Sequence, residues 1–207
     1  MKTTGAAAGK KAARPAKKRE VKPLPSIAQS WARIEAWFGK HPEFALGLRP
    51  GVKPKDLAAA EKTLGVRLPD DLRASLLIHD GQEPGSDVEW LPFAQQLGSL
   101  AALVACWKDD RKYFDDQEME KRLDWLDESQ RVRQVHLHPR HIPFAGSRYW
   151  DYGRLLIDFL PGPKGTEGQV IAREDIEFVF VASSYGALLE QLATGLERGK
   201  LKVHRRS

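Results

Sequence analysis

Three histidines come closest to the spacing of a metal site. His136 and His138 alternate along a segment rich in β-forming residues, and His141 follows nearby. Alternate residues of a strand share one face, so these imidazoles could meet at one zinc ion. A structural zinc needs a fourth ligand, but Cys106 is the single cysteine and Pro139 interrupts the strand. We therefore favour ordinary, partly exposed histidines and predict no bound metal, and a metal-dependent hydrolase is the third-ranked hypothesis.

Paired carboxylates could also support acid–base catalysis. The hydrophilic segment around residue 110 alternates acidic residues with lysine and arginine, which is typical of a solvated charged face. The glycine-rich residues 162–168 lack the Lys-Ser/Thr ending of a phosphate-binding loop and do not precede a helix. No nucleophile elbow is present either, so the sequence predicts a protein that is not an enzyme and has no cofactor. The four aspartates considered are Asp109, Asp110, Asp115 and Asp116.

The basic residues crowd at the two ends of the chain. Residues 1–25 carry eight Lys/Arg and one Glu, and residues 199–207 carry four Lys/Arg. The middle, residues 26–198, has 21 basic and 27 acidic residues, a net charge of −6, although the whole chain carries +5. We expect a disordered basic arm over residues 1–25, one folded domain over residues 26–198, and a basic tail over residues 199–207. The arm is either a solubilising tail or a weak, salt-sensitive contact to nucleic acid or another polyanion.

The sequence shows no sign of a membrane segment. It contains no run of eighteen apolar residues, and the N-terminal region lacks the apolar centre of a secretory signal. We therefore expect a cytoplasmic protein.

Several segments have the periodicity of helices with one buried face. Gly65 is expected to cap the second of them in a left-handed conformation, and Gly81 to end the third. Residues 115–134 are strongly charged and fit either an exposed helix or a loop insertion. The expected helices span residues 26–41, 54–64, 69–81, 100–114 and 183/184–199.

A hairpin within residues 150–171 is the most informative local pattern. An apolar strand containing Asp158 leads into a turn rich in glycine and proline. Gly162, Gly165 and Gly168 are expected to allow positive φ angles there, and Asp158 to accept hydrogen bonds from the turn. The expected strands span residues 88–93, 135–138, 142–145, 155–159, 169–172 and 176–181.

The order of these elements predicts the fold class. Helices come first, strands whose separations favour antiparallel pairing follow, and one helix ends the series. We expect an α+β fold in which N-terminal helices pack on a mostly antiparallel sheet that is closed by a C-terminal helix.

A set of motifs over about residues 27–196 resembles the SUKH superfamily, first named for yeast cell-wall-assembly regulators of the SMI/KNR type. The set comprises an amphipathic opening helix with Trp31, an LG-x-x-LP step, HDGQ at residues 79–82, IPFA at residues 142–145, the strand containing Asp158, and the PG-x-x-G-x-x-GQV turn. The sequence departs from the family pattern at two places. Asp80 stands where the family often has Asn, and the aromatic pair Tyr149–Trp150 precedes Asp151 where Gly is common. The LG-x-x-LP step is formed by Leu64, Gly65, Leu68 and Pro69.

The resemblance implies a non-catalytic protein-binding module. Many bacterial SUKH proteins are immunity proteins that neutralise toxins, often nucleases, whereas the fungal relatives act as regulatory scaffolds in cell-wall signalling. The acidic body fits the first role, because nuclease toxins tend to present basic grooves and opposite charges steer association. We expect an immunity protein whose partner is a toxin encoded by a neighbouring gene, and the alternative is a regulatory adaptor with a polyanion-binding arm.

The expected partner surface is acidic and aromatic. Trp150 is expected to be partly exposed, because polar and aromatic neighbours compete for the same small strand edge. The predicted contact residues are Asp80, Gln82, Trp90, Trp150 and Asp151.

Overall fold

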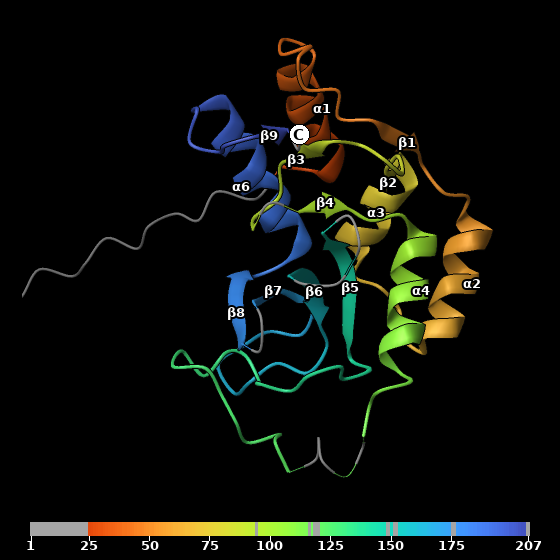
Figure 1. Ribbon diagram of the computed structural model, residues 1–207, viewed down its shortest axis with the longest axis vertical. Coiled ribbons are helices and arrows are strands. Elements are labelled where there is room, and N and C mark those ends of the chain that lie inside the picture. The colour runs from red at the N-terminus through yellow and green to blue at the C-terminus, as the bar shows by residue number, and fades with distance from the viewer. Residues whose placement is uncertain are drawn as a thin grey trace, which may run out of the picture.

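The computed structural model describes residues 25–93, 95–115, 117, 121–147, 150, 153–174 and 177–205 (Figure 1). These residues form the predicted α+β fold. Its helices are α1 (Ile27–Phe38), α2 (Pro54–Leu64), α3 (Asp70–Ile78), α4 (Leu100–Asp110) and α6 (Tyr185–Glu197).

The main sheet has the strand order β4-β5-β6-β7-β8, and every neighbouring pair is antiparallel. The strands are β4 (Gln96–Leu97), β5 (His141–Gly146), β6 (Arg154–Asp158), β7 (Gln169–Glu174) and β8 (Glu177–Ala182). Two short pairs complete the β structure: β1 (Leu48–Pro50) with β2 (His79–Gln82), and β3 (Val88–Glu89) with β9 (His204–Arg205). The basic C-terminal segment is thus paired with the body through β9.

The two faces of the sheet are covered differently. Alternate residues such as Leu155 and Ile157 on β6 join the large core that the helices close. Leu156, between them, faces the other way and packs with Val132 and Phe178 in a smaller cluster. Residues 121–140 therefore supply cover on the face opposite the helices, where the green chain passes below the sheet in Figure 1.

Local capping explains where the principal helices begin. The Ser26 hydroxyl oxygen accepts a hydrogen bond from the Gln29 backbone N–H, and the Ser26 backbone N–H donates to Gln29 Oε1, so α1 starts with a capping box. Ser99 and Ser184 cap α4 and α6 with one bond each, since their hydroxyl oxygens accept from the Ala102 and Ala187 N–H groups. Arg33 of α1 then reaches across to carboxylates of α6, which fixes how the first and last helices pack.

Three predicted elements differ from the structure. The strand expected over residues 88–93 is confined to β3, Val88–Glu89, because the chain turns by Phe93, whose φ is 64°. Residues 79–82, expected to end the third helix, form β2, because the helix stops at Ile78 and the chain pairs with β1. Residues 135–138, expected to be a strand, form a turn in which Leu137 has a φ of 56°. In the charged segment, the described residues 121–134 are a loop with one antiparallel bridge, Leu126 to Arg133.

The glycine-rich turn also differs in detail. Gly168 has a φ of 84°, as expected, but Gly162 and Gly165 do not have positive φ angles. A Cβ on Gly162 would lie 2.5 Å from the Gln130 carbonyl oxygen, and one on Gly165 would overlap the Arg131 carbonyl. These two glycines are therefore required by the close approach of two backbones.

Candidate functional site

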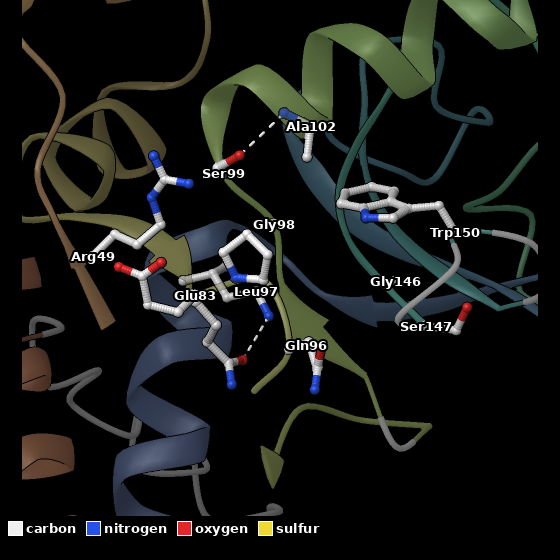
Figure 2. A pocket seen from close by; sticks show the side chains of 13 residues that line it. Arg49, Glu83, Gln96, Leu97, Gly98, Ser99, Ala102, Gly146, Ser147 and Trp150 are labelled. Carbon is white, nitrogen blue, oxygen red and sulfur yellow. Dashed lines mark hydrogen bonds between the residues drawn. The ribbon is translucent and has the colours of Figure 1, made fainter. Parts of the chain in front are cut away.

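A cavity of about 410 Å³ opens at the β4 end of the main sheet (Figure 2). Arg49 and Glu83 lie on one side and Trp150 on the other, with the first turn of α4 between them. We call it the Trp150 groove. Its lining also includes Gln82, Pro84, Gly85, Gln96, Leu97, Gly98, Ser99, Ala102, Gly146 and Ser147.

Glycines form the surface on which the Trp150 indole rests. A Cβ on Gly98 would overlap the indole ring, and a Cβ on Gly146 would lie 3.3 Å from it. Beneath this layer, a Cβ on Gly81 would lie 2.5 Å from the backbone of Gly98. The groove thus depends on three backbones that approach one another without side chains.

Trp150 is held in place through its backbone. Its carbonyl oxygen accepts hydrogen bonds from Nε and Nη2 of Arg154, at 3.0 and 2.6 Å. Nη1 of Arg154 contacts both carboxylate oxygens of Asp110 at 2.7 Å. The guanidinium therefore links the end of α4 to the residue that bears the indole. Trp150 itself has a φ of 57° and is half-buried.

Two other predicted partner-contact residues, Gln82 and Trp90, are buried. Gln82 Nε2 donates to the carbonyl oxygens of Leu46 and Val88, and its Oε1 accepts from Trp90 Nε1 and the Leu97 N–H. Gln82 is 6% exposed and Trp90 is 1% exposed. The buried amide holds β2, β3 and β4 together, which leaves little of either side chain for a partner.

Asp80 is buried as well. One carboxylate oxygen accepts a hydrogen bond from the Leu100 N–H at the start of α4, at 2.7 Å. The other lies 3.3 Å from Nη2 of Arg49, which is partly exposed. Asp80 therefore holds Arg49 at the groove, and its predicted contact with a partner stays a prediction.

These positions revise the predicted partner surface. Of its members, Trp150 lines the groove with partial exposure and the buried Gln82 also lines it. Asp80 and Trp90 are buried and do not line it, and Asp151 lies outside the described residues. The sequence reasoning did not single out Arg49 or Glu83. They reach the site because β1 pairs with β2 and the chain turns after β2, and neither event has a strong local signal.

The three histidines do not converge on a metal site. Among the described residues, which include all three, no group of three or more His, Cys, Asp or Glu side chains could hold a metal ion. His136 packs against Phe178, and His138 Nδ1 accepts a hydrogen bond from the Arg140 N–H. His141 Nε2 lies 3.4 Å from Asp158 Oδ1 without hydrogen-bond geometry.

Asp158 is fully buried at the base of the hairpin. Its carboxylate accepts hydrogen bonds from the Leu160 N–H at 2.7 Å and from Gln169 Nε2 at 2.8 Å. Its backbone oxygen accepts a third from the Gly168 N–H. Asp158 thereby ties both ends of the glycine-rich turn together.

The fold and the groove define a class of protein: an α+β domain with a preformed, aromatic-lined surface groove. The chain belongs to the SMI1/KNR4 family (SUKH-1), whose sequence model matches residues 51–191.

Curated relatives include regulators of fungal cell-wall synthesis. The chain is 30% identical over 210 residues to a "Glucan synthesis regulatory protein" of Neurospora crassa, covering 84% of this chain and 39% of the relative. It is 30% identical over 193 residues to "Cell wall biosynthesis/cell cycle regulator smi1" of Schizosaccharomyces pombe, covering 86% and 38%. It is 26% identical over 206 residues to "Cell wall assembly regulator SMI1" of Saccharomyces cerevisiae, covering 82% and 40%.

The chain spans about two-fifths of the length of these relatives. Their names support the regulatory alternative more than the immunity role that the sequence analysis ranked first. No helix among the described residues is long and apolar enough to cross a membrane.

Proposed function

We propose that this chain is a non-catalytic regulatory domain that binds a protein partner in the Trp150 groove. The observation that carries the proposal is the half-buried indole, fixed by Arg154 and resting on glycine backbones beside a cavity of about 410 Å³. Rigid aromatic side chains with a polar surround are common anchors of protein interfaces.

The charge of the body supports a basic partner segment. Residues 26–198 carry −6, and Glu83 at the mouth of the groove is exposed. Arg49 is already paired with Asp80, so its charge is partly compensated. An incoming lysine or arginine would therefore meet a favourable field beside the indole.

The same acidic charge keeps the immunity role as a second candidate. A nuclease toxin with a basic groove would also be attracted to this body. The regulatory proposal has the additional support of the relatives' names. The two roles differ in the partner, which is a regulated cellular protein in the first and a toxin encoded by a neighbouring gene in the second.

A photo-crosslinking residue at Glu83, which is exposed and lines the groove, can identify the partner in the native host. We expect one cellular protein to be crosslinked, and the same residue placed at exposed Lys62 on α2 to give no such product. A toxin encoded by a neighbouring gene would instead support the immunity role.

The purified partner should then bind the wild-type protein and lose about tenfold or more in affinity for Trp150→Ala. Tyr113→Ala is the control, since Tyr113 is an aromatic residue that is 72% exposed and does not line the groove. Equal affinities for wild type and Trp150→Ala would contradict the proposal.

A further inference from the structure

The main sheet ends in strand β8, at the opposite side from the Trp150 groove. The strand order places β4, which lines that groove, at one edge and β8 at the other. In Figure 1, β8 lies at the outer end of the sheet with the segment of residues 121–134 passing beside its lower end. An edge strand presents backbone groups that can pair with another strand.

A side-chain amide already imitates such a neighbour at one point of β8. Gln134 Nε2 donates to the Phe178 carbonyl oxygen, and Gln134 Oε1 accepts from the Phe178 N–H, both at 2.8 Å. The amide thus makes the pair of hydrogen bonds that a residue of an adjacent strand would make. It shows that the backbone groups of Phe178 point away from β7.

The same reasoning applies to Phe180. Backbone groups of alternate strand residues point to the same side, and the β7 register is regular from Arg173–Phe178 to Ile171–Phe180. The N–H and C=O of Phe180 therefore also point outward. Among the described residues, none forms a hydrogen bond with them on that side.

Several hydrogen bonds hold the segment beside this edge in place. The Asp127 carboxylate accepts hydrogen bonds from the Ser129, Arg131 and Val132 N–H groups, which closes a turn. The Trp125 carbonyl oxygen accepts from the Gln134 N–H at 2.8 Å and sets the position of the capping amide. The glycine-rich turn braces the other side of this loop, since Gly162 and Gly165 pack directly on its backbone, as described above.

Two cavities meet along the outer edge of β8, and Val179, Asp127 and Ser129 line both. The larger, about 1180 Å³, extends past Phe178 to the exposed Trp125. The smaller, about 460 Å³, lies at Phe180. We call them together the β8 groove. Its remaining lining residues are Arg122, Leu126, Glu128, Gln134, His136 and Glu177 in the larger cavity, and Arg131 and Lys164 in the smaller.

The β8 groove has a charge gradient along the strand. Glu128 and Glu177 line the larger cavity, and Glu177 is the first residue of β8; Arg122 offsets only part of their charge. Arg131 and Lys164 lie at the Phe180 end, and the Arg131 guanidinium sits 4.6 Å from the centre of the Phe180 ring. The groove is thus acidic at one end and basic at the other.

We propose that the β8 groove binds an extended peptide segment of a partner protein, which adds to the sheet as a strand antiparallel to β8. Its central residue pairs with the backbone of Phe180 in the way that Gln134 pairs with Phe178. Antiparallel addition continues the pairing of the whole sheet. It places an acidic residue at the N-terminal end of the peptide beside Lys164. The paired part of the peptide stops short of Phe178, whose outward groups Gln134 already holds, and a long basic side chain at the C-terminal end of the peptide reaches past that amide toward Glu177.

The walls of the groove favour a single strand over a second copy of this chain. Trp125 and the turn at Asp127 rise beside the strand edge and line the cavities. A narrow, extended occupant fits between such walls, whereas edge-to-edge pairing of two folded domains needs an open edge. The β8 groove is separate from the Trp150 groove. A negative result for peptide binding at β8 would therefore leave the proposed function of the Trp150 groove untouched.

Titration of the full chain with a capped peptide, Glu-Val-Thr-Val-Thr-Lys, tests the proposal by NMR shifts and calorimetry. We expect saturable binding with shifts along β8 and at Trp125. The charge-reversed peptide, Lys-Val-Thr-Val-Thr-Glu, should bind more weakly. N-methylation of the second valine, the residue that pairs with Phe180, removes a donor and should weaken binding about fivefold. No binding, or equal affinity for all three peptides, would overturn the proposal.

Variants of the protein give an independent test. Phe180→Pro removes the outward N–H, which edge strands tolerate, and Phe180→Ala is its control because it removes the ring alone. We expect the proline variant to bind at least about fivefold more weakly than the alanine variant, with thermal unfolding confirming that both fold. Lys164→Glu should weaken binding of the first peptide, whereas Lys62→Glu on α2 should not.

Two results would count against the peptide as occupant. Peptide affinity that is equal in the two Phe180 variants would show that the outward N–H is not used. Dimerisation of the wild-type chain in sedimentation experiments, abolished by Phe180→Pro but not by Phe180→Ala, would show that a second copy occupies the edge.

Discussion

At the scale of single residues, glycines decide the shape of the Trp150 groove. Gly65 and Gly81 have nearly the same backbone conformation, with φ angles of 70° and 74°. Their surroundings differ: a Cβ on Gly65 would meet nothing within 4 Å, whereas one on Gly81 would lie 2.5 Å from the Gly98 backbone. Glycine is therefore required at position 65 for its backbone conformation alone. At position 81 it is required both for its conformation and because a side chain would overlap the Gly98 backbone.

We predict that Gly81→Ala destabilises the fold much more than Gly65→Ala. The Gly65 variant should lose about 1 kcal/mol of unfolding free energy, from the left-handed conformation alone. The Gly81 variant adds a backbone overlap and should lose more than about 3 kcal/mol. Denaturant unfolding of the two variants measures the difference, and similar losses would show that the contact with Gly98 relaxes freely.

At the scale of elements, the segment after Val132 covers the sheet face opposite the helices and contains His138. Burial disfavours the charged imidazolium, and nearby His141 and Arg140 act in the same direction, so the pKa of His138 falls from 6.5 to about 4. The hydrogen bond from the Arg140 N–H to Nδ1 fits the neutral ring. The segment that covers this face of the sheet is therefore most stable when the His138 imidazole is neutral.

We predict that stability falls as the pH drops from about 6.5 to about 4. In that range the unfolded chain takes up a proton at His138 that the folded protein does not, so the folded state loses relative stability; above pH 6.5 this effect is absent. Because the ring is only partly buried, we expect about 1–2 kcal/mol from this residue. His138→Gln should flatten this part of the pH profile of unfolding, and His204→Gln, on exposed β9, is the control.

At the scale of the whole molecule, charge and fold are distributed differently along the chain. The family match covers residues 51–191, whereas the densest basic segment is residues 1–25. Cationic residues bind polyanions through the release of counterions, which makes such binding strongly dependent on salt. Polyanion binding and partner binding should therefore be separable.

We predict that deletion of residues 1–25 leaves the thermal unfolding temperature nearly unchanged and abolishes retention on DNA at low salt. Their composition supplies almost no apolar surface to bury, and their eight cations would make the contact with DNA. Protein binding in the Trp150 groove should persist. A truncated protein that unfolds at a clearly lower temperature, or that still binds DNA as tightly, would refute this division.

The sequence by itself determined the elements whose signals are local. The apolar spacing and the cap Gly65 predicted α2 with its observed bounds, because helix periodicity and capping depend on neighbouring residues. The hairpin of β6 and β7 was likewise predicted, from two apolar strands around a glycine-rich turn, and so was the α+β class.

The tertiary structure alone decided which predicted residues are accessible and where the grooves lie. Gln82 and Trp90 read as surface candidates, but hydrogen bonds between segments far apart in the chain bury them. Arg49 reaches its site only through the pairing of β1 with β2, and Gln134 caps β8 from 44 residues away. Burial and edge exposure depend on contacts between distant segments, which local residue patterns do not encode.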